Sequence, residues 1–280
     1  MERRAFGEGV SVSVIGIGCS RVGSVSNPVP TREIEAMLEA AVDAGVSLFD
    51  TANIYGQGDS ERTLARLLRR RHERLFVVTK VGGRHSRYAG AIRLAKPVLR
   101  VLARSHAGVQ TAVVKTRTAT VVHDFLPVDL NSAVDASRRR LGLDRLDGLL
   151  LHSPSIATLR KPDIHDCLDQ MVQDGKAAWV GASVDSAEAL TAALTIPALT
   201  MVQAPIAEID ELAGSEVLET IRARRIGLFA REVLRRSDRA LDERPSPRAA
   251  LAAALAFEVV TAAIVGVSTR QHLRELLGSG

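Results

Sequence analysis

Four ionisable residues stand where they could transfer a proton together. Asp50, Lys80 and His152 each end a short apolar run, and Tyr55 follows Asp50 five residues later. A phenol ionises at about pH 10, and a nearby ammonium group lowers that value toward neutrality. We therefore interpret Tyr55 as a general acid tuned by Lys80, with Asp50 keeping the lysine charged. His152 is then the candidate that binds and orients a substrate carbonyl oxygen.

Each of these residues also has an ordinary structural explanation when it is taken alone. An Asp-Thr pair often caps a helix, a Tyr-Gly pair often forms a turn, and a lysine after a strand is usually solvated. A single histidine is usually structural. Their order on consecutive strands nevertheless favours one site, because the carboxyl ends of parallel barrel strands meet at one face.

Apolar, β-branched runs alternate with helical patterns along the chain, as consecutive βα units do. The predicted strands are Val14–Gly18, Leu48–Thr51, Phe76–Lys80, Gly148–His152, Trp179–Ser183, Met201–Ala204, Gly227–Ala230 and Ala263–Gly266. The predicted helices are Thr31–Ala44, Ser60–Arg71, Asp129–Leu141, Asp163–Asp174, Ser186–Ala193, Ser215–Arg224, Pro247–Ala256 and Arg270–Leu277. This pattern predicts an α/β fold, a single-domain (β/α)₈ TIM barrel over residues 1–280.

A doubly wound dinucleotide-binding sheet is the alternative fold. The run Gly16–Arg21 argues against it, because the run lacks the third glycine and the immediate helix of that fingerprint.

Residues 81–122 are too long for a simple loop, and we interpret them as an insertion after the third strand, partly helical around 89–103. Its section 84–117 is basic and has no acidic residue. The section is either a lid that attracts an anionic substrate or a solvated amphipathic helix. Aromatic residues too sparse for base stacking argue against nucleic-acid binding. Tyr88 and His123 are candidate substrate residues in the pocket wall.

Composition restricts the class of protein further. Of 280 residues, 46% are hydrophobic and 25% charged, so a full core can form. Two cysteines, Cys19 and Cys167, indicate a reducing, cytoplasmic setting rather than a disulfide framework. We expect no signal peptide, no membrane span and no metal site, and the oligomeric state stays open.

Several motifs together resemble the aldo-keto reductase superfamily. They are FDTANIYGQGDSE (Phe49–Glu61), VVTK (Val77–Lys80), SRRRLGLDRLDGLLLHSP (Ser137–Pro154), GKAAWVGAS (Gly175–Ser183) and VQAP (Val202–Pro205). The resemblance implies a (β/α)₈ barrel that uses NAD(P) to reduce carbonyls or oxidise alcohols. It also implies a catalytic tetrad of Asp50, Tyr55, Lys80 and His152, in which Tyr55 protonates the oxygen while hydride comes from nicotinamide C4.

The resemblance also implies a set of cofactor-binding residues. These are Gly18, Cys19, Ser183, Gln203, Ala230, Arg231, Val267, Ser268, Thr269, Arg270, His272, Arg274 and Glu275. Arg231 stands where many members stack a tyrosine on the nicotinamide, and a planar guanidinium can also stack there. Arg270 and Arg274 could pair with a 2′-phosphate. NADP(H) is therefore favoured, with NAD(H) possible.

Some positions depart from the family pattern. Val184 stands in place of an asparagine beside the nicotinamide, while Val267 and His272 replace a lysine and an arginine of the adenosine-phosphate segment. At Val184 one hydrogen bond to the nicotinamide is lost, and the departures at Val267 and His272 keep NAD(H) possible beside NADP(H).

The substrate is less defined by the sequence. The region before His152 resembles a bacterial and plant branch that acts on aldoses, galactose-like lactols or pyridoxal, and the long carboxyl-terminal loop of steroid-binding members is missing. NADP(H)-dependent carbonyl reduction is the leading function, and NAD-dependent oxidation of a sugar or pyridoxal to a lactone is the alternative. A Schiff-base aldolase using Lys80 and a non-catalytic cofactor-sensing subunit are two further alternatives.

Overall fold

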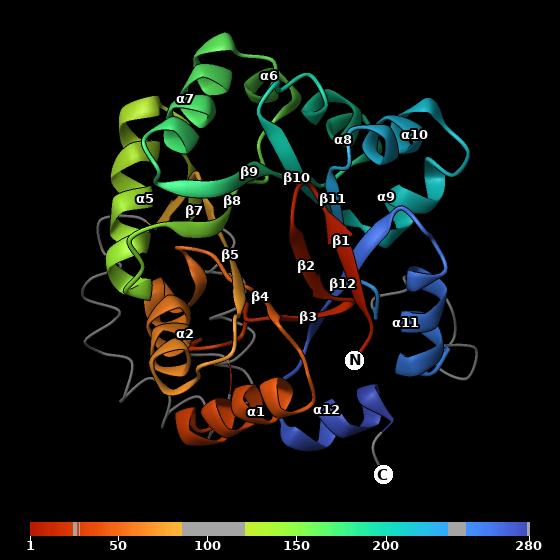
Figure 1. The fold of residues 1–280 in the computed structure, drawn as a ribbon. Coiled ribbons are helices and arrows are strands. Elements are labelled where there is room, and N and C mark those ends of the chain that lie inside the picture. The colour runs from red at the N-terminus through yellow and green to blue at the C-terminus, as the bar shows by residue number, and fades with distance from the viewer. Residues whose placement is uncertain (25–26, 28, 86–120, 235–244, 279–280) are drawn as a thin grey trace, which may run out of the picture.

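Eight parallel strands close into a barrel in the computed structural model, which describes residues 1–24, 27, 29–85, 121–234 and 245–278 (Figure 1). Around the barrel the strands are β3 (Ile15–Gly18), β4 (Leu48–Asp50), β5 (Phe76–Val81), β8 (Leu146–His152), β9 (Ala177–Ser183), β10 (Leu199–Pro205), β11 (Gly227–Arg231) and β12 (Val260–Gly266). β12 pairs with β3 and completes the ring. The predicted (β/α)₈ barrel is confirmed.

Helices surround the ring of strands in Figure 1. They are α1 (Thr31–Asp43), α2 (Asp59–Arg70), α5 (Pro127–Leu141), α6 (Ile156–Leu159), α7 (Pro162–Gln173), α8 (Ala187–Ala193), α9 (Ile206–Glu211), α10 (Glu216–Ala223), α11 (Pro247–Leu255) and α12 (Arg270–Leu277), with a 3₁₀ turn, η1 (Tyr55–Gly58), ahead of α2. The predicted helices match within two residues at each end. The short α6, α9 and η1 were not expected, since a single turn leaves little periodicity in a sequence.

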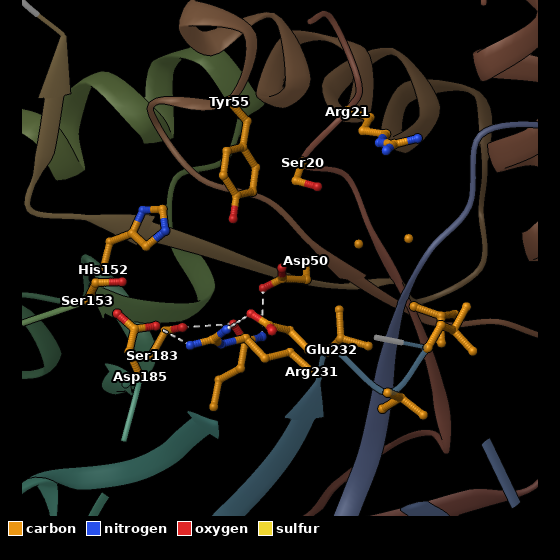
Figure 2. A pocket seen from close by; sticks show the side chains of 17 residues that line it. Ser20, Arg21, Asp50, Tyr55, His152, Ser153, Ser183, Asp185, Arg231 and Glu232 are labelled. Carbon is orange, nitrogen blue, oxygen red and sulfur yellow. Dashed lines mark hydrogen bonds and ion pairs between the residues drawn. The ribbon is translucent and has the colours of Figure 1, made fainter. Parts of the chain in front are cut away.

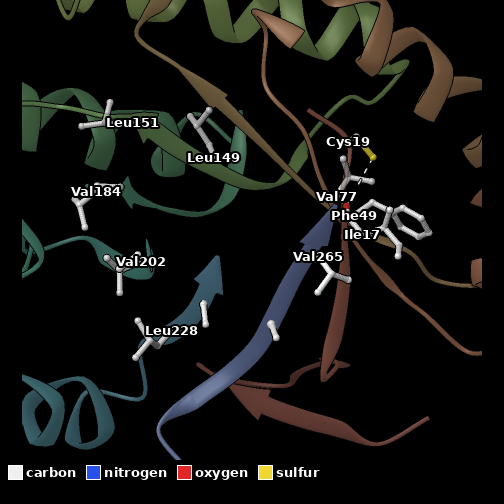
Figure 3. Close-up of a cluster of buried hydrophobic side chains, with 14 of the residues drawn as sticks. Ile17, Cys19, Phe49, Val77, Leu149, Leu151, Val184, Val202, Leu228 and Val265 are labelled. Atoms are coloured by element: carbon white, nitrogen blue, oxygen red, sulfur yellow. Dashed lines mark hydrogen bonds between the residues drawn. The ribbon is translucent and has the colours of Figure 1, made fainter. Parts of the chain in front are cut away.

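Alternate strand residues point to opposite sides of the barrel wall. Leu48, Val78 and Leu150 belong to the cluster that fills the interior. Their neighbours Phe49, Val77 and Leu149 belong to the larger cluster between strands and helices (Figure 3). The same alternation directs Asp50 of β4, Lys80 of β5 and His152 of β8 inward, so that these strands deliver polar side chains to one space.

An antiparallel hairpin, β1 (Arg3–Phe6) and β2 (Val10–Ser13), closes the amino-terminal end of the barrel. Phe6 packs edge-on against Phe76, Trp179 and Phe229 within the interior cluster. The hairpin was not predicted, although the glycines of its Gly7-Glu8-Gly9 turn and the alternation of Val10–Ser13 carry its signal. With this end sealed, the opposite end of the barrel is free to hold a site.

A second hairpin follows β5, made of β6 (Gly83–His85) and β7 (Val121–His123). It forms the base of the insertion predicted over residues 81–122. Arg84 in this hairpin pairs with Asp124 at 3.3 Å. The predicted helix around 89–103 and most of the basic section 84–117 lie outside the described residues.

Candidate active site

A buried ion pair lies at the carboxyl ends of β4 and β5. Lys80 Nζ donates to both Asp50 oxygens, at 2.5 and 2.6 Å, and to the Thr51 carbonyl oxygen at 3.1 Å. The two residues are only 1% and 5% exposed. Burial disfavours the charged amine, but the Asp50 carboxylate and the Tyr55 phenol outweigh that effect, so the pKa of Lys80 is raised. Lys80 therefore stays charged at neutral pH.

Tyr55 lies above this pair, at the start of η1. Lys80 Nζ lies 5.4 Å from the centroid of the Tyr55 ring. The His152 ring meets the Tyr55 ring edge-on, with centroids 5.7 Å apart. Figure 2 shows the phenol pointing into a pocket, with His152 to one side and Asp50 beneath. The structure thus brings together the four residues that the sequence singled out.

His152 is half-buried and uncharged at neutral pH. Burial, the charge of Lys80 and the nearby His123 and Arg231 lower its pKa from 6.5 to about 3. Its Nδ1 atom is buried and has no hydrogen-bond partner among the described residues. A neutral imidazole carries one N–H donor, so His152 can offer a hydrogen bond to a carbonyl oxygen without supplying a charge.

A chain of polar side chains extends the ion pair toward β9 and β10. Ser183 Oγ donates to Gln203 Oε1 at 3.0 Å, and Gln203 Nε2 donates to Asp50 Oδ1 at 3.0 Å. Both residues are nearly fully buried, and both line the pocket. The Ser183 oxygen can still accept a bond, and the Gln203 amide retains one N–H. This pair of groups complements a carboxamide, so the site fits the nicotinamide ring of a dinucleotide.

The pocket has a volume of about 460 Å³. All of the predicted tetrad except Lys80 borders it directly, and Lys80 contacts Asp50 and lies 5.4 Å from the centre of the Tyr55 ring. Among the predicted cofactor residues, Gly18, Ser183, Gln203 and Arg231 line it.

The other predicted cofactor residues lie elsewhere. Cys19 and Ala230 are fully buried, and the Cys19 thiol faces the carbonyl oxygen of Ile17 within the core. Burial, with the Asp50 charge, raises the pKa of this thiol. The Cys19 side chain therefore does not reach the pocket, and any cofactor contact at this position falls to the backbone.

Arg231, at the end of β11, is held by carboxylates on two sides. Its guanidinium pairs with Asp185 and Glu232 and donates to the Val184 carbonyl oxygen at 2.7 Å. Glu232 adopts a left-handed backbone conformation with φ of 60°, which is uncommon for a residue with a side chain. Arg231 therefore forms a fixed, planar, cationic wall of the pocket.

The segment after β12 leads away from the pocket toward α12. Gly266 still lines the pocket, Val267 is buried, and the Thr269 hydroxyl caps α12 by accepting from the backbone N–H of His272 at 3.2 Å. Arg270, His272, Arg274 and Glu275 are exposed, and Ser268 is half-buried. These side chains do not border the described pocket.

Several pocket residues were not singled out from the sequence. They are Ser20, Arg21, Ser153, Asp185, Glu232, Val233, Leu234, Ile264 and Val265. Most follow directly after strands β3, β8, β9 and β11, so the rule that barrel sites form at strand carboxyl ends could have found them.

Of the two predicted substrate residues, only His123 lies among the described residues. His123 is exposed on β7 and stacks on Phe125, with ring centroids 6.2 Å apart. Its charge is one of the causes that lower the pKa of His152. It does not line the described pocket. Tyr88 lies outside the described residues.

The described ranges also bear on metal binding and membrane insertion. Within these ranges there is no group of three or more His, Cys, Asp or Glu side chains that could hold a metal ion. None of the described helices is long and apolar enough to span a membrane.

Comparison with known proteins agrees with this barrel. The aldo/keto reductase family profile matches residues 14–238, and the chain belongs to this family. It is 30% identical over 168 residues to pyridoxal 4-dehydrogenase of Microbacterium luteolum, a match that covers 59% of this chain and 46% of that protein. It is 29% identical over 238 residues to D-threo-aldose 1-dehydrogenase of a Pseudomonas species, covering 83% and 69%. The match thus spans about half of the first relative.

Solved structures share the fold. A putative aldo-keto reductase from Pseudomonas aeruginosa superposes with a TM-score of 0.73 at 24% identity, covering 98% of this chain and 93% of the other. The holo form of an aldo-keto reductase from Bacillus halodurans gives 0.72 at 20% identity, covering 99% and 90%. The family to which the chain belongs comprises oxidoreductases that act on carbonyl or alcohol groups, and it implies a nicotinamide cofactor.

Proposed function

We propose that this protein is an NADP(H)-dependent oxidoreductase that reduces an aldehyde or ketone to an alcohol, or catalyses the reverse reaction. The observation that carries the proposal is the centre of the Tyr55 ring lying 5.4 Å from the charged Lys80 amine, beside a neutral His152. A proton donor, a tuning cation and a neutral hydrogen-bond donor are what carbonyl reduction requires of the protein.

Each residue has a separate part in the proposed mechanism. A bound nicotinamide supplies or accepts the hydride. Ser183 and Gln203 orient its carboxamide, and His152 donates a hydrogen bond that fixes the substrate carbonyl oxygen. Tyr55 gives its proton to that oxygen, and the charged Lys80 amine stabilises the phenolate that remains. Asp50 holds the amine in place throughout.

The environment of Lys80 argues against the aldolase alternative. A Schiff-base lysine must lose its proton to attack a carbonyl carbon. Here the amine contacts both oxygens of a buried carboxylate, and its pKa is raised. Lys80 is thus equipped to act as a charge rather than as a nucleophile.

Preference for NADP(H) is supported by the charges of α12. This helix begins directly after the segment that leaves the pocket at Gly266, and it exposes Arg270 and Arg274. Guanidinium groups pair well with phosphate oxygens, and a 2′-phosphate distinguishes NADP(H) from NAD(H). NAD(H) would lack this contact.

A second candidate is oxidation of a sugar lactol or of pyridoxal to a lactone with NAD. The two relatives named above support it, since one is a pyridoxal dehydrogenase and the other an aldose dehydrogenase. The same tetrad serves this reaction, with Tyr55 accepting the proton that the alcohol loses.

A turnover screen tests both candidates. Aldehydes and ketones are offered with NADPH or NADH, and aldoses and pyridoxal are offered with NADP⁺ or NAD⁺. Reduction with NADPH supports the leading proposal, while lactone formation with NAD⁺ supports the second. Absence of turnover across the panel, with cofactor binding intact by titration, would overturn both.

A further inference from the structure

The proposed chemistry depends on where Lys80 lies relative to Tyr55, and residues on the far side of the barrel wall bear on that position. The positioning inference that follows rests on the proposed function. Asp50 and Lys80 face the interior, while the residues that follow or precede them, Thr51 and Thr79, are fully buried and face the helices. Both threonines are hydrogen-bonded to the first turn of α2.

The contact beside Asp50 is made by Ser60. The Ser60 and Thr51 hydroxyls lie 2.7 Å apart, and Ser60 Oγ also donates to the Cys19 carbonyl oxygen at 3.0 Å. Because the Ser60 proton goes to Cys19, Thr51 is the donor between the two hydroxyls. One serine of α2 thereby ties the ends of β3 and β4 together.

The contact beside Lys80 is made by Glu61. Thr79 Oγ1 donates to Glu61 Oε1 at 2.7 Å, and Arg140 of α5 donates from Nε to Glu61 Oε2 at 2.5 Å. Glu61 is fully buried, and the Arg140 side chain is 22% exposed. A carboxylate inside a protein is retained only when it is paired and hydrogen-bonded, and these two donors meet that need. Glu61 is therefore held firmly between β5 and α5.

Arg140 also lies against the turn that carries Tyr55. Gly56, Gln57 and Gly58 have φ values of 58°, 53° and 84°, so three consecutive residues are left-handed. A Cβ at Gly58 would lie 2.7 Å from Arg140 Cδ, and a Cβ at Gly56 would lie 2.8 Å from the Gly23 carbonyl carbon. A side chain at either glycine would therefore collide with these neighbours, and of the three residues only Gln57 is in a conformation that its surroundings must impose.

We propose that Glu61, clamped by Arg140 and bonded to Thr79, is a positioning residue that fixes Lys80 against the Tyr55 phenol. The Arg140 side chain lies close to Gly58 in the turn that bears Tyr55, and its guanidinium holds the carboxylate that bonds to the strand of Lys80. The distance between the proton donor and its cation is thus set from outside the pocket.

Substitutions at Thr79 test the positioning role of Glu61 with little change in the shape of the side chain. Thr79→Val replaces the hydroxyl with a methyl group and breaks the link to Glu61, while Thr79→Ser keeps the hydroxyl. Thr261→Val is the matched control, because Thr261 is a buried strand threonine near the amino-terminal end of β12, where it accepts from Leu228 N–H. All three are compared with wild type for kcat, KM and melting temperature.

We expect Thr79→Val to lower kcat by about tenfold or more, with KM changed less than about twofold, because a small misplacement slows proton transfer without removing binding contacts. Thr79→Ser should recover most of that loss. A Thr79→Val enzyme whose kcat matches the Thr261→Val control would overturn the proposal, even if both variants melt at lower temperature.

An activity-free measurement separates this inference from the proposed function. The chain has two tyrosines, so in a Tyr88→Phe background phenolate absorbance reports Tyr55 alone. Lys80 on β5, Asp50 on β4 and His152 on β8 face this phenol.

Thr79→Val should move the Tyr55 titration to higher pH by about half a unit or more, since the phenolate loses part of its cation. An unchanged titration contradicts the positioning role. If the wild type turns over no substrate, the proposed function fails and the titration alone decides the positioning role.

Discussion

The two ends of the proposed cofactor site differ in how firmly the protein holds them. At the nicotinamide end, Lys80 and Asp50 are almost completely buried and joined by bonds of 2.5 and 2.6 Å. At the adenosine end, Arg270 and Arg274 are exposed on α12. In the proposed function the chemistry therefore depends on a network that the fold determines, whereas cofactor choice would depend on surface charges. Such charges can change without disturbing the barrel.

The largest effect is expected from the phenol itself. Tyr55→Phe should reduce turnover by roughly 10²–10⁴-fold, the usual contribution of a general acid or base, while cofactor affinity stays near that of wild type. Steady-state kinetics and fluorescence titration with NADPH measure the two quantities. Near-normal turnover in Tyr55→Phe would remove the phenol from the mechanism.

We also expect the buried contact between Arg140 and Glu61 to contribute more to the free energy of unfolding than a surface ion pair does. Arg140→Met should lower the free energy of unfolding by about 3 kcal/mol, because the fully buried Glu61 loses its cation. Arg138→Met, on the same helix, removes a partly exposed pair with Asp135 and should cost less than about 1 kcal/mol. Urea denaturation at neutral pH measures both. Equal losses would show that the Glu61 contact is no stronger than a surface pair.

We expect His152 to make the folding stability of the protein sensitive to acid. Its pKa of about 3 in the folded protein lies below the value of 6.5 expected when unfolded, so the unfolded state binds the proton more readily. The stabilising contribution of the neutral ring is complete above pH 6.5 and is lost as the pH falls toward 3.

Within that window, stability should fall by up to about 1.4 kcal/mol per pH unit from this group. His152→Asn should remove this part of the slope. Denaturation curves between pH 7 and about pH 4.5 measure it, and identical slopes for the two proteins would refute the neutral state of the His152 ring.

The smallest effect is expected at the exposed end. Wild type should bind NADPH roughly tenfold more tightly than NADH, and Arg270→Ala should remove most of that preference with turnover on saturating cofactor retained. Arg69→Ala, an exposed arginine at the other end of the barrel, should leave the ratio unchanged. Equal affinity of the wild type for the two cofactors in direct titrations would favour the NAD-dependent alternative.

The same contrast explains what the sequence could predict. Asp50, Lys80 and His152 end apolar strands, and closure of the barrel brings strand ends together, so their meeting followed from the pattern alone. Glu61 and Arg140 read as ordinary helix charges. Their contact spans 79 positions along the chain and depends on how α2 and α5 pack, which no local pattern encodes.

The carboxylates around Arg231 illustrate a second kind of contact that the sequence does not predict. The sequence suggested a guanidinium that stacks on the nicotinamide, and the structure adds that Asp185 and Glu232 fix its plane. Asp185 belongs to the loop after β9 and lies 46 positions from Arg231 in the chain. Pairing between residues of different loops follows from the closed ring of strands, so it could not be foreseen residue by residue.

Transfer of a labelled hydrogen tests the central claim most directly. Wild-type enzyme is given an aldehyde with NADPH carrying deuterium at nicotinamide C4, prepared separately in each of its two orientations, and the alcohol is examined by mass spectrometry. Only one face of a nicotinamide bound in this pocket would meet the substrate, so we expect deuterium on the carbinol carbon from one of the two C4 stereoisomers only. The Tyr55→Phe enzyme should form almost no labelled alcohol. An alcohol formed without label from either orientation would contradict direct hydride transfer in this pocket.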